Sequence, residues 1–526
     1  MHIRARPGTL AQSHMDSIRI TIRPGGLTHE CERGALLADA LMDMGIMVRT
    51  PCGGKGICGK CAIHADGGLD GGEMRDEKGP HNGRPYLACR AKTVGDVTVY
   101  MPETAPLPSK KKLSLPPEAR LGVAVDVGTT TIQISLVPEG GAPLFVDSLM
   151  NPQRRFGHDI ISRIAASRDR NIRSRITAAA RNAIASSLES VFSSSDIAAS
   201  RIDTIAVSGN TAMMYFLFGM DALPLGEYPY TARRLDFDNC TPGDIGLHGM
   251  PNARLYALPA ASAFLGGDSI GGLALAEASG YGTSLFFIDL GTNGEIFVRD
   301  GQGAALGTSC AMGPALEGMN IAYGMTAGDG AISHVRRTNA TWLPTVIGGG
   351  APLGICGTGI IDMLAILLRD GIVGTDGAIR PADSESSVAR TETRNGVRAV
   401  PIHGEIALTQ KDIRAIQLAK GASRAASHIL LDEAGITPGG ISDVLLAGAF
   451  GENLDIDNFR ALGFIPDFPN ARYHFLGNSS LAAAERACFD TSFISRAKSL
   501  RDGIRIIDLA THRRFNDEFV QSISFL

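Results

Sequence analysis

The stretch PCGGKGICGKC at residues 51–61 contains three cysteines, and a fourth follows in YLACR at residues 86–90. The four are Cys52, Cys58, Cys61 and Cys89, with the spacing C-x5-C-x2-C-x27-C. Three thiolates from one loop and a fourth from a later segment are typical ligands of a [2Fe–2S] cluster. Glycines without a Cβ allow such a loop to curl around the sulfurs. The sequence therefore predicts a [2Fe–2S] cluster bound by these four cysteines.

A zinc site, disulfides and a P-loop each fit these cysteines less well. A structural zinc site more typically has two C-x2-C-like pairs, whereas the first pair here is spread to x5. Disulfides are disfavoured because the chain has nine cysteines, an odd number, and no export signal. GKGICGKC at residues 54–61 matches a P-loop except that a cysteine replaces the hydroxyl residue that binds magnesium. We expect buried free thiols at Cys31, Cys240, Cys310, Cys356 and Cys488.

Length and charge narrow the class of protein. A chain of 526 residues is too long for one ordinary core, so two or three domains are expected. The formal net charge of −4 gives no reason to expect nucleic acid or an anionic membrane as partner. No apolar run approaches the roughly 18 residues of a membrane span. Residues 1–15 lack the apolar segment of a signal peptide, so we expect a loose N-terminal extension and a cytoplasmic protein.

Residues 16–103 have the pattern of a small α+β domain. IRITI (18–22) and LTHEC (27–31) alternate across a Pro-Gly-Gly turn, which predicts a hairpin. A short amphipathic helix over 35–45, the cysteine loop and further strands follow, in the β-grasp order of [2Fe–2S] ferredoxins. The x5 cysteine spacing resembles that of adrenodoxin-like ferredoxins. Residues 104–120, rich in proline and lysine, predict a stiff linker.

The rest of the chain contains an internal repeat. LGVAVDVGTTTIQISLV (121–137) and LFFIDLGTNGEIFVRD (285–300) each predict a hairpin with an aspartate near its tip, and Asp126 and Asp289 are 163 residues apart. Each aspartate can organise Mg²⁺ and the attacking water, while glycine, threonine and asparagine approach phosphate oxygens. Two such tips facing each other would hold a polyphosphate from both sides. The predicted phosphate contacts are Gly128, Thr129, Thr130, Gly291, Thr292 and Asn293.

These hairpins resemble the phosphate motifs of the actin, sugar-kinase and heat-shock-chaperone ATPases. The resemblance implies that residues 121–510 form a duplicated α/β, ribonuclease H-like domain with two lobes. It further suggests connecting segments at 207–219 and 354–365 and an adenosine motif at 444–455. CAMGPALEGMN (310–320) parallels a helix start near the nucleotide in activators of 2-hydroxyacyl-CoA dehydratases. The additional nucleotide-binding candidates are Gly209, Asn210, Glu317, Gly448, Ala449 and Gly451.

The whole arrangement, including NPQRRFGHDIISRI (151–164) and LTQKDIRAIQLAKGA (408–422), resembles the reductive activators of corrinoid enzymes. The resemblance covers residues 16–510 and leaves 511–526 as a C-terminal tail. It implies ATP-dependent, one-electron reduction of Co(II) to Co(I) in the corrinoid protein of a methyltransferase system, with an upstream reductase or ferredoxin as electron donor. No D-x-H-x-x-G corrinoid motif is present, so the cobalt is expected on another protein.

Two alternatives remain open from the sequence. One is a small-molecule kinase linked to a ferredoxin module. The other is an electron-carrier subunit whose ATPase fold is not catalytic. Intact aspartates at both hairpin tips, Asp126 and Asp289, argue against the second alternative.

Overall fold

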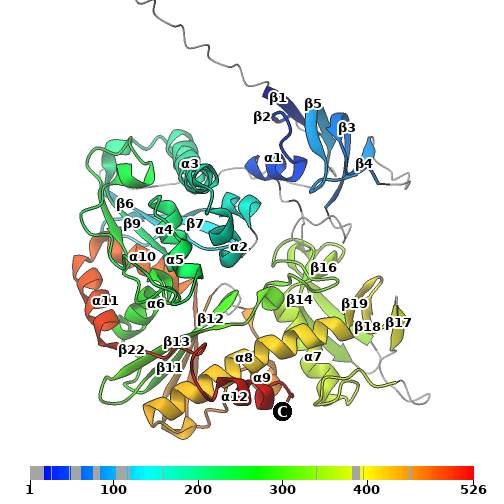
Figure 1. The fold of residues 1–526 in the computed structure, drawn as a ribbon, viewed down its shortest axis with the longest axis vertical. Coiled ribbons are helices and arrows are strands. Elements are labelled where there is room, and N and C mark those ends of the chain that lie inside the picture. The colour runs from blue at the N-terminus through cyan, green and yellow to red at the C-terminus, as the bar shows by residue number, and fades with distance from the viewer. Residues whose placement is uncertain are drawn as a thin grey trace, which may run out of the picture. The chain divides into compact units, whose positions relative to one another are not determined.

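The computed structural model divides into two compact units, residues 1–109 and 110–526 (Figure 1). The described residues are 17–24, 26–44, 46, 48, 61–74, 83–101, 115, 119–157, 159–338, 341–381, 391–394, 396–448 and 453–526. The extension 1–15, most of the predicted linker 104–120, and the site candidates Cys52, Cys58, Ala449 and Gly451 lie outside these residues. Within them, no helix is both long and apolar enough to span a bilayer.

The first unit is built on a five-stranded mixed sheet with the order β2-β1-β5-β3-β4 (Figure 1). Its strands are β1 (Ser17–Arg23), β2 (Thr28–Glu32), β3 (Ala62–Asp70), β4 (Arg84–Leu87) and β5 (Lys92–Tyr100). β1 is parallel to β5, and the other neighbours are antiparallel. Ile20 and Ile22 of β1 share a core with Leu37 and Leu41 of α1 (Leu37–Asp43). The prediction of a β-grasp ferredoxin fold is confirmed.

The first lobe of the second unit contains a five-stranded sheet with the order β10-β9-β6-β7-β8. Its strands are β6 (Leu121–Val127), β7 (Thr131–Pro138), β8 (Leu144–Met150), β9 (Ile202–Gly209) and β10 (Arg254–Ala257). Its helices are α2 (Ile160–Ala166), α3 (Arg170–Ser195), α4 (Thr211–Leu217) and α5 (Leu223–Gly226). β6 is buried along its whole length, as expected for an apolar strand between two neighbours.

The second lobe contains a six-stranded sheet with the order β21-β20-β11-β12-β13-β22. Its strands are β11 (Leu285–Leu290), β12 (Asn293–Arg299), β13 (Ala305–Ala311), β20 (Asp443–Ala447), β21 (Arg472–Gly477) and β22 (Ile504–Ile506). The long helix α8 (Gln410–Ala434) packs against β12 and β13 (Figure 1). The shared strand order of the two sheets confirms the predicted duplication of an actin-like α/β domain.

An insertion between β13 and α8 enlarges the second lobe. It contains a three-stranded sheet, the helix α7 (Gly357–Arg369), and a second three-stranded sheet. The strands are β14 (Ala331–Thr338), β15 (Thr341–Val346), β16 (Gly354–Ile355), β17 (Glu392–Arg394), β18 (Val397–His403) and β19 (Ile406–Thr409). Ile360 and Leu364 of α7 belong to the main core of the second lobe.

The prediction that residues 207–219 and 354–365 are the connecting segments of the fold is wrong. They form β9–α4 and β16–α7, whose apolar side chains pack inside the separate cores of the first and second lobes. The helices that join the lobes are α6 (Gly267–Ala278), which leads from β10 to β11, and α10 (Ser479–Phe489), which follows β21. They pack against each other in a core that includes residues of both sheets.

The segment predicted as a C-terminal tail belongs to the second lobe. It contains α12 (Phe515–Ser522), which packs against α8 (Figure 1). The helices α9 (Ile456–Leu462) and α11 (Thr491–Gly503) precede α12 in the chain. Lys420 of α8 is fully buried and donates to the carbonyl oxygen of Ser522 at 2.7 Å and to that of Ser524. Because a buried ammonium needs acceptors, these bonds hold the end of the chain on α8.

Candidate functional site

The two hairpin tips of the repeat meet at one carboxylate. Thr130 Oγ1 on the β6–β7 tip donates to Glu317 Oε2 at 3.1 Å, and Thr292 Oγ1 on the β11–β12 tip donates to Glu317 Oε1. Glu317 ends the short helical turn η4 (Pro314–Glu317), which follows β13. Three predicted nucleotide-site residues from distant parts of the sequence therefore lie together between the lobes.

Asp126 lies near the end of β6 and is only 9% exposed. Ser480 Oγ donates to its Oδ1 at 2.7 Å, and Asn478 Nδ2 donates to its Oδ2 at 2.8 Å. Burial raises the pKa of the Asp126 carboxyl, and these two hydrogen bonds partly oppose that rise. Asn478 also caps the first turn of α10, so this connecting helix starts in contact with the first lobe's aspartate.

Asp289, at the equivalent place in β11, belongs to a group of partly buried carboxyls. Burial, and then repulsion from Asp126, raise the pKa of Asp289 to about 7. Burial and the charge of Asp289 raise the pKa of Asp268, in the first turn of α6, to about 7 as well. Glu295, opposite Asp289 in the β11–β12 register, has a pKa raised in the same way. An all-oxygen set of this kind suits Mg²⁺ rather than a soft metal.

Four residues of this site, Asp268, Glu295, Asn478 and Ser480, were not predicted from the sequence. The available signal for Asp268 was an acidic residue directly after two glycines at the start of an apolar helix, in GGDS (266–269). The two residues at the start of α10 carried no local signal, because they reach Asp126 only through the fold.

The backbone of the first hairpin tip accepts hydrogen bonds from the segment NPQRRFGHDIISRI (151–164). Asn151 Nδ2 donates to the carbonyl oxygen of Gly128 at 2.8 Å, and Arg163 Nη2 donates to that of Thr129 at 2.6 Å. Arg163 is fully buried, and its pKa is lowered to about 9 by burial and by the neighbouring Arg154. These contacts fix the backbone of the tip.

Two further predicted residues flank the tips. Asn210 Nδ2 donates to Thr129 Oγ1 at 3.0 Å, and the adjacent Gly209 ends β9. Gly448 follows β20 with φ +95°, and a Cβ on it would lie 2.5 Å from the carbonyl oxygen of Leu290 and 2.8 Å from Asp289 Oδ1. Only glycine therefore fits beside the aspartate at this position.

In the first unit, Cys61 and Cys89 bring two sulfurs together. Their Sγ atoms are 3.2 Å apart, and the residues are 1% and 5% exposed. They come from opposite ends of the β3–β4 segment, as expected for ligands of one cluster. This pair fits the predicted metal centre, whose other two cysteines lie outside the described residues.

The remaining five cysteines form no disulfide within the described part of the chain. Cys310, Cys356 and Cys488 are buried, as predicted, whereas Cys31 and Cys240 are partly exposed. Burial, and then the charge of Glu295, raise the pKa of Cys310 to about 12, so this thiol stays protonated near neutral pH.

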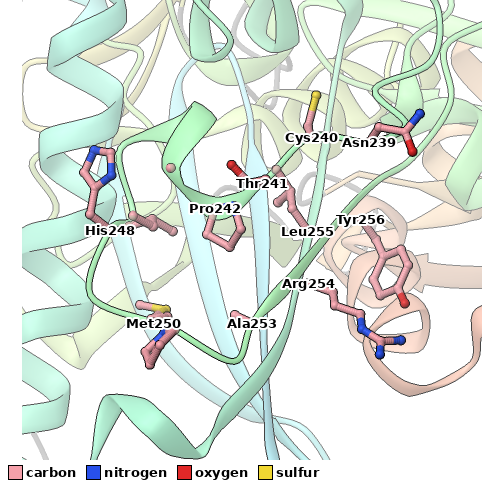
Figure 2. A pocket seen from close by; sticks show the side chains of 13 residues that line it. Asn239, Cys240, Thr241, Pro242, His248, Met250, Ala253, Arg254, Leu255 and Tyr256 are labelled. Carbon is pink, nitrogen blue, oxygen red and sulfur yellow. The ribbon is translucent and has the colours of Figure 1, made fainter.

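A pocket of about 520 Å³ lies in the first lobe (Figure 2). The segment 239–256 lines it, including Thr241, His248 and Tyr256. None of the predicted site residues takes part in its lining.

Comparisons with known proteins agree with this architecture. The family model of the RACo middle region matches residues 121–279, and that of the C-terminal domain of RACo, the ASKHA domain, matches residues 283–526. A model of the 2Fe-2S iron-sulfur cluster binding domain matches residues 20–94. The model of the middle region therefore covers the first lobe and α6.

Individual relatives extend the match along the chain. The corrinoid activation enzyme RamQ of Eubacterium limosum is 28% identical over 418 residues, covering 77% of this chain and 70% of RamQ. A [Co(II) methylated amine-specific corrinoid protein] reductase of Methanosarcina barkeri is 27% identical over 261 residues, 45% of each chain. A solved reductive activator for corrinoid, iron-sulfur protein has the same fold, with a TM-score of 0.70, 23% identity, and coverage of 97% of this chain and 98% of that one. The chain belongs to the RACo family of reductive activators, with an N-terminal 2Fe-2S domain and a two-lobed ASKHA domain.

Proposed function

We propose that this chain is an ATP-dependent activator that transfers one electron to the cobalt of a separate corrinoid protein, converting Co(II) to Co(I) and restoring methyl transfer. One observation carries the proposal. The same chain combines a converging pair of buried thiols in a ferredoxin unit with paired, carboxylate-bearing hairpins in an ATPase unit. The names of the two relatives support a corrinoid protein as the partner.

We infer that Cys61 and Cys89 hold a [2Fe–2S] cluster together with Cys52 and Cys58. When bound, such a cluster supplies one-electron transfer, near −400 mV in plant-type ferredoxins. Each electron passed on must be replaced, so we infer an upstream reductase or ferredoxin as donor. We infer a reducing compartment such as the cytoplasm, since the described cysteines form no disulfide.

We infer that ATP with Mg²⁺ binds between the hairpin tips. Asp126 and Asp289 would organise the ion and the attacking water, and Gly448 with its neighbours would lie under the adenosine. The proposed phosphate contacts are Gly128, Thr129, Thr130, Gly291, Thr292 and Asn293. Gly209, Asn210 and Glu317 are further nucleotide-binding candidates. Mutually repelling, partly buried carboxyls support a cation here, because a divalent ion offsets the repulsion. Among the described residues no three acidic, histidine or cysteine side chains form a ready ligand set, which fits an ion held largely through water and phosphate.

The joint between the lobes suggests how ATP assists the electron transfer. Asn478 and Ser480 start α10, which follows a strand of the second sheet, yet both donate to Asp126 of the first sheet. A ligand that draws the tips together therefore moves α10 as well. ATP can bias such a motion only by binding one arrangement more tightly than the other. Transferring one electron to an acceptor whose reduction potential is 100 mV lower costs about 2.3 kcal/mol, which ATP hydrolysis can supply.

The substitution Asp289→Ala tests the assignment of the ATP site. It should abolish ATP hydrolysis while leaving the visible spectrum of the cluster unchanged, because the two sites lie in separate units. Unchanged hydrolysis in Asp289→Ala would remove this assignment.

A further inference from the structure

Two oppositely charged residues occupy equivalent positions in the two halves of the repeat. Arg154 follows Asp126 by 28 residues (126 to 154), and Glu317 follows Asp289 by the same 28 residues (289 to 317). Each lies in a short helical turn directly after the third strand of its lobe, η1 (Pro152–Phe156) after β8 and η4 after β13. The duplicated fold thus brings a cation from one lobe and a carboxylate from the other toward the hairpin tips.

Arg154 is a buried cation whose guanidinium donates to weak hydrogen-bond acceptors. The residue is 8% exposed, and its Nη1 and Nη2 atoms contact the sulfurs of Met150 and Met319 at 3.1 and 3.7 Å. Thioether sulfur is a weak acceptor. In the part of the chain that the structure describes, the guanidinium makes no ion pair with a carboxylate, and the opposing charge that acts on it is that of Glu317. Burying a charge in this way is costly unless a partner compensates for it.

The position of Arg154 relative to the first tip is fixed by its turn. Asn151 caps the turn through the amide of Gln153 at 3.0 Å. The same residue donates its side-chain amide to Gly128 and its backbone N–H to the carbonyl oxygen of Thr130 at 2.9 Å. The side chain of Arg154 reaches Met319 of the second lobe, two residues beyond the carboxylate that both tip threonines contact. The guanidinium therefore extends from the turn bonded to the first tip and contacts the second lobe.

Building on the proposed function, we propose that Arg154 contacts the terminal phosphate of the nucleotide held between the tips and so distinguishes ATP from ADP. The planar guanidinium fork matches phosphate oxygens with two parallel charge-assisted hydrogen bonds. Gly448, beside the proposed adenosine position, belongs to the second lobe, whereas Arg154 belongs to the first. A contact made with ATP and lost with ADP supplies the difference in affinity that a two-lobed switch requires.

The substitution Arg154→Met separates this role from a structural one. Methionine is apolar and flexible, and it would pack against the two methionines that now surround the guanidinium. Replacing a poorly paired buried charge by an apolar side chain should leave the unfolding temperature unchanged or raise it. The affinity for ATP, measured by calorimetry, should fall about 10- to 100-fold, since hydrogen bonds to charged groups contribute that much, whereas the affinity for ADP should be retained. The matched control is Arg168→Met, which removes a charge of the same lobe from an exposed pair with Glu227.

The possible results are distinct. An unchanged preference for ATP over ADP in Arg154→Met would overturn the inference, and so would an equal loss of both nucleotides accompanied by a lower unfolding temperature. Failure of the unaltered protein to bind either nucleotide would instead overturn the proposed ATP site. Arg154→Lys, which keeps the charge but not the fork, should lose part of the preference.

Discussion

Replacing Asp289 with asparagine should stabilise the ATPase unit while inactivating it. Burial and the charge of Asp126 raise the pKa of Asp289 to about 7, compared with 3.8 for an ordinary aspartate. The ionised carboxylate therefore costs the folded state free energy that the unfolded state does not bear. Asparagine has nearly the same shape and carries no charge, so Asp289→Asn should remove this cost.

The size and the pH dependence of the effect follow from the two pKa values. The difference between about 7 and 3.8 corresponds to roughly 4 kcal/mol, since one pKa unit is about 1.4 kcal/mol. The folded pKa is the higher one, so the folded state binds more protons between these values and its stability falls as pH rises. The cost is absent below about pH 4, grows up to about pH 7 and is constant above it. Asp289→Asn should therefore match the unaltered protein near pH 4 and exceed its stability by up to roughly 4 kcal/mol at about pH 8.

The assay is urea unfolding of the ATPase unit without nucleotide at about pH 4 and about pH 8, combined with ATP hydrolysis at the higher pH. Asp457→Asn is the matched control, because that aspartate is 87% exposed and its carboxylate is 3.7 Å from Arg460. A variant that is less stable at the higher pH, or one that still hydrolyses ATP, would refute the reasoning about Asp289.

Two further substitutions probe the cluster and the glycine beside Asp289. Cys61→Ser should remove or destabilise the cluster, and so weaken its visible absorption, because an iron loses a thiolate. Cys310→Ser should leave the absorption intact because that thiol lies in the other unit. A normal spectrum in Cys61→Ser would contradict the ligand assignment. Gly448→Ala should abolish ATP binding and destabilise the unit by about 1–3 kcal/mol, because its Cβ would collide with Leu290 and Asp289. Gly280→Ala, at a similar positive φ but with nothing within 4 Å of the added Cβ, is the control, and equal effects of the two alanines would exclude the collision as the cause.

The hairpins could be predicted from the sequence because their signal is local. Asp126 and Asp289 end unbroken apolar runs, which form buried central strands, and each is followed by a glycine and small polar residues at the turn. The ferredoxin sheet was predicted from the same kind of local pattern. Whatever depends only on strand alternation and turn residues was therefore within reach of the sequence.

The joint between the lobes was not within reach, because it depends on the order of strands in each sheet. A glycine-rich helix start at 354–365 has the same local pattern as the one at 266–269, and only the fold shows that α6 rather than α7 connects the lobes. Asn478 reaches Asp126 across 352 residues of sequence. No periodicity or motif encodes such a contact.

The end of the chain shows the same limitation. Residues 511–526 have a tail-like position in the sequence, but their docking depends on the buried ammonium of Lys420. A lysine within an amphipathic helix normally indicates an exposed face. The acceptor carbonyl of Ser522 lies 102 residues further along the chain, so no local pattern pairs it with this lysine.

The most direct test of the proposed function follows the visible spectrum of a cognate corrinoid protein in the Co(II) state under anaerobic conditions. With reductant, ATP and the intact chain, we predict conversion to Co(I), or to methyl-Co(III) when the methyl donor is present. Cutting the chain between Pro108 and Pro116, near the division between the units, should preserve cluster reduction and basal ATP hydrolysis but sharply slow the conversion, because a short tether supplies an effective concentration of about millimolar. Co(II) consumed equally fast without ATP would contradict the central claim.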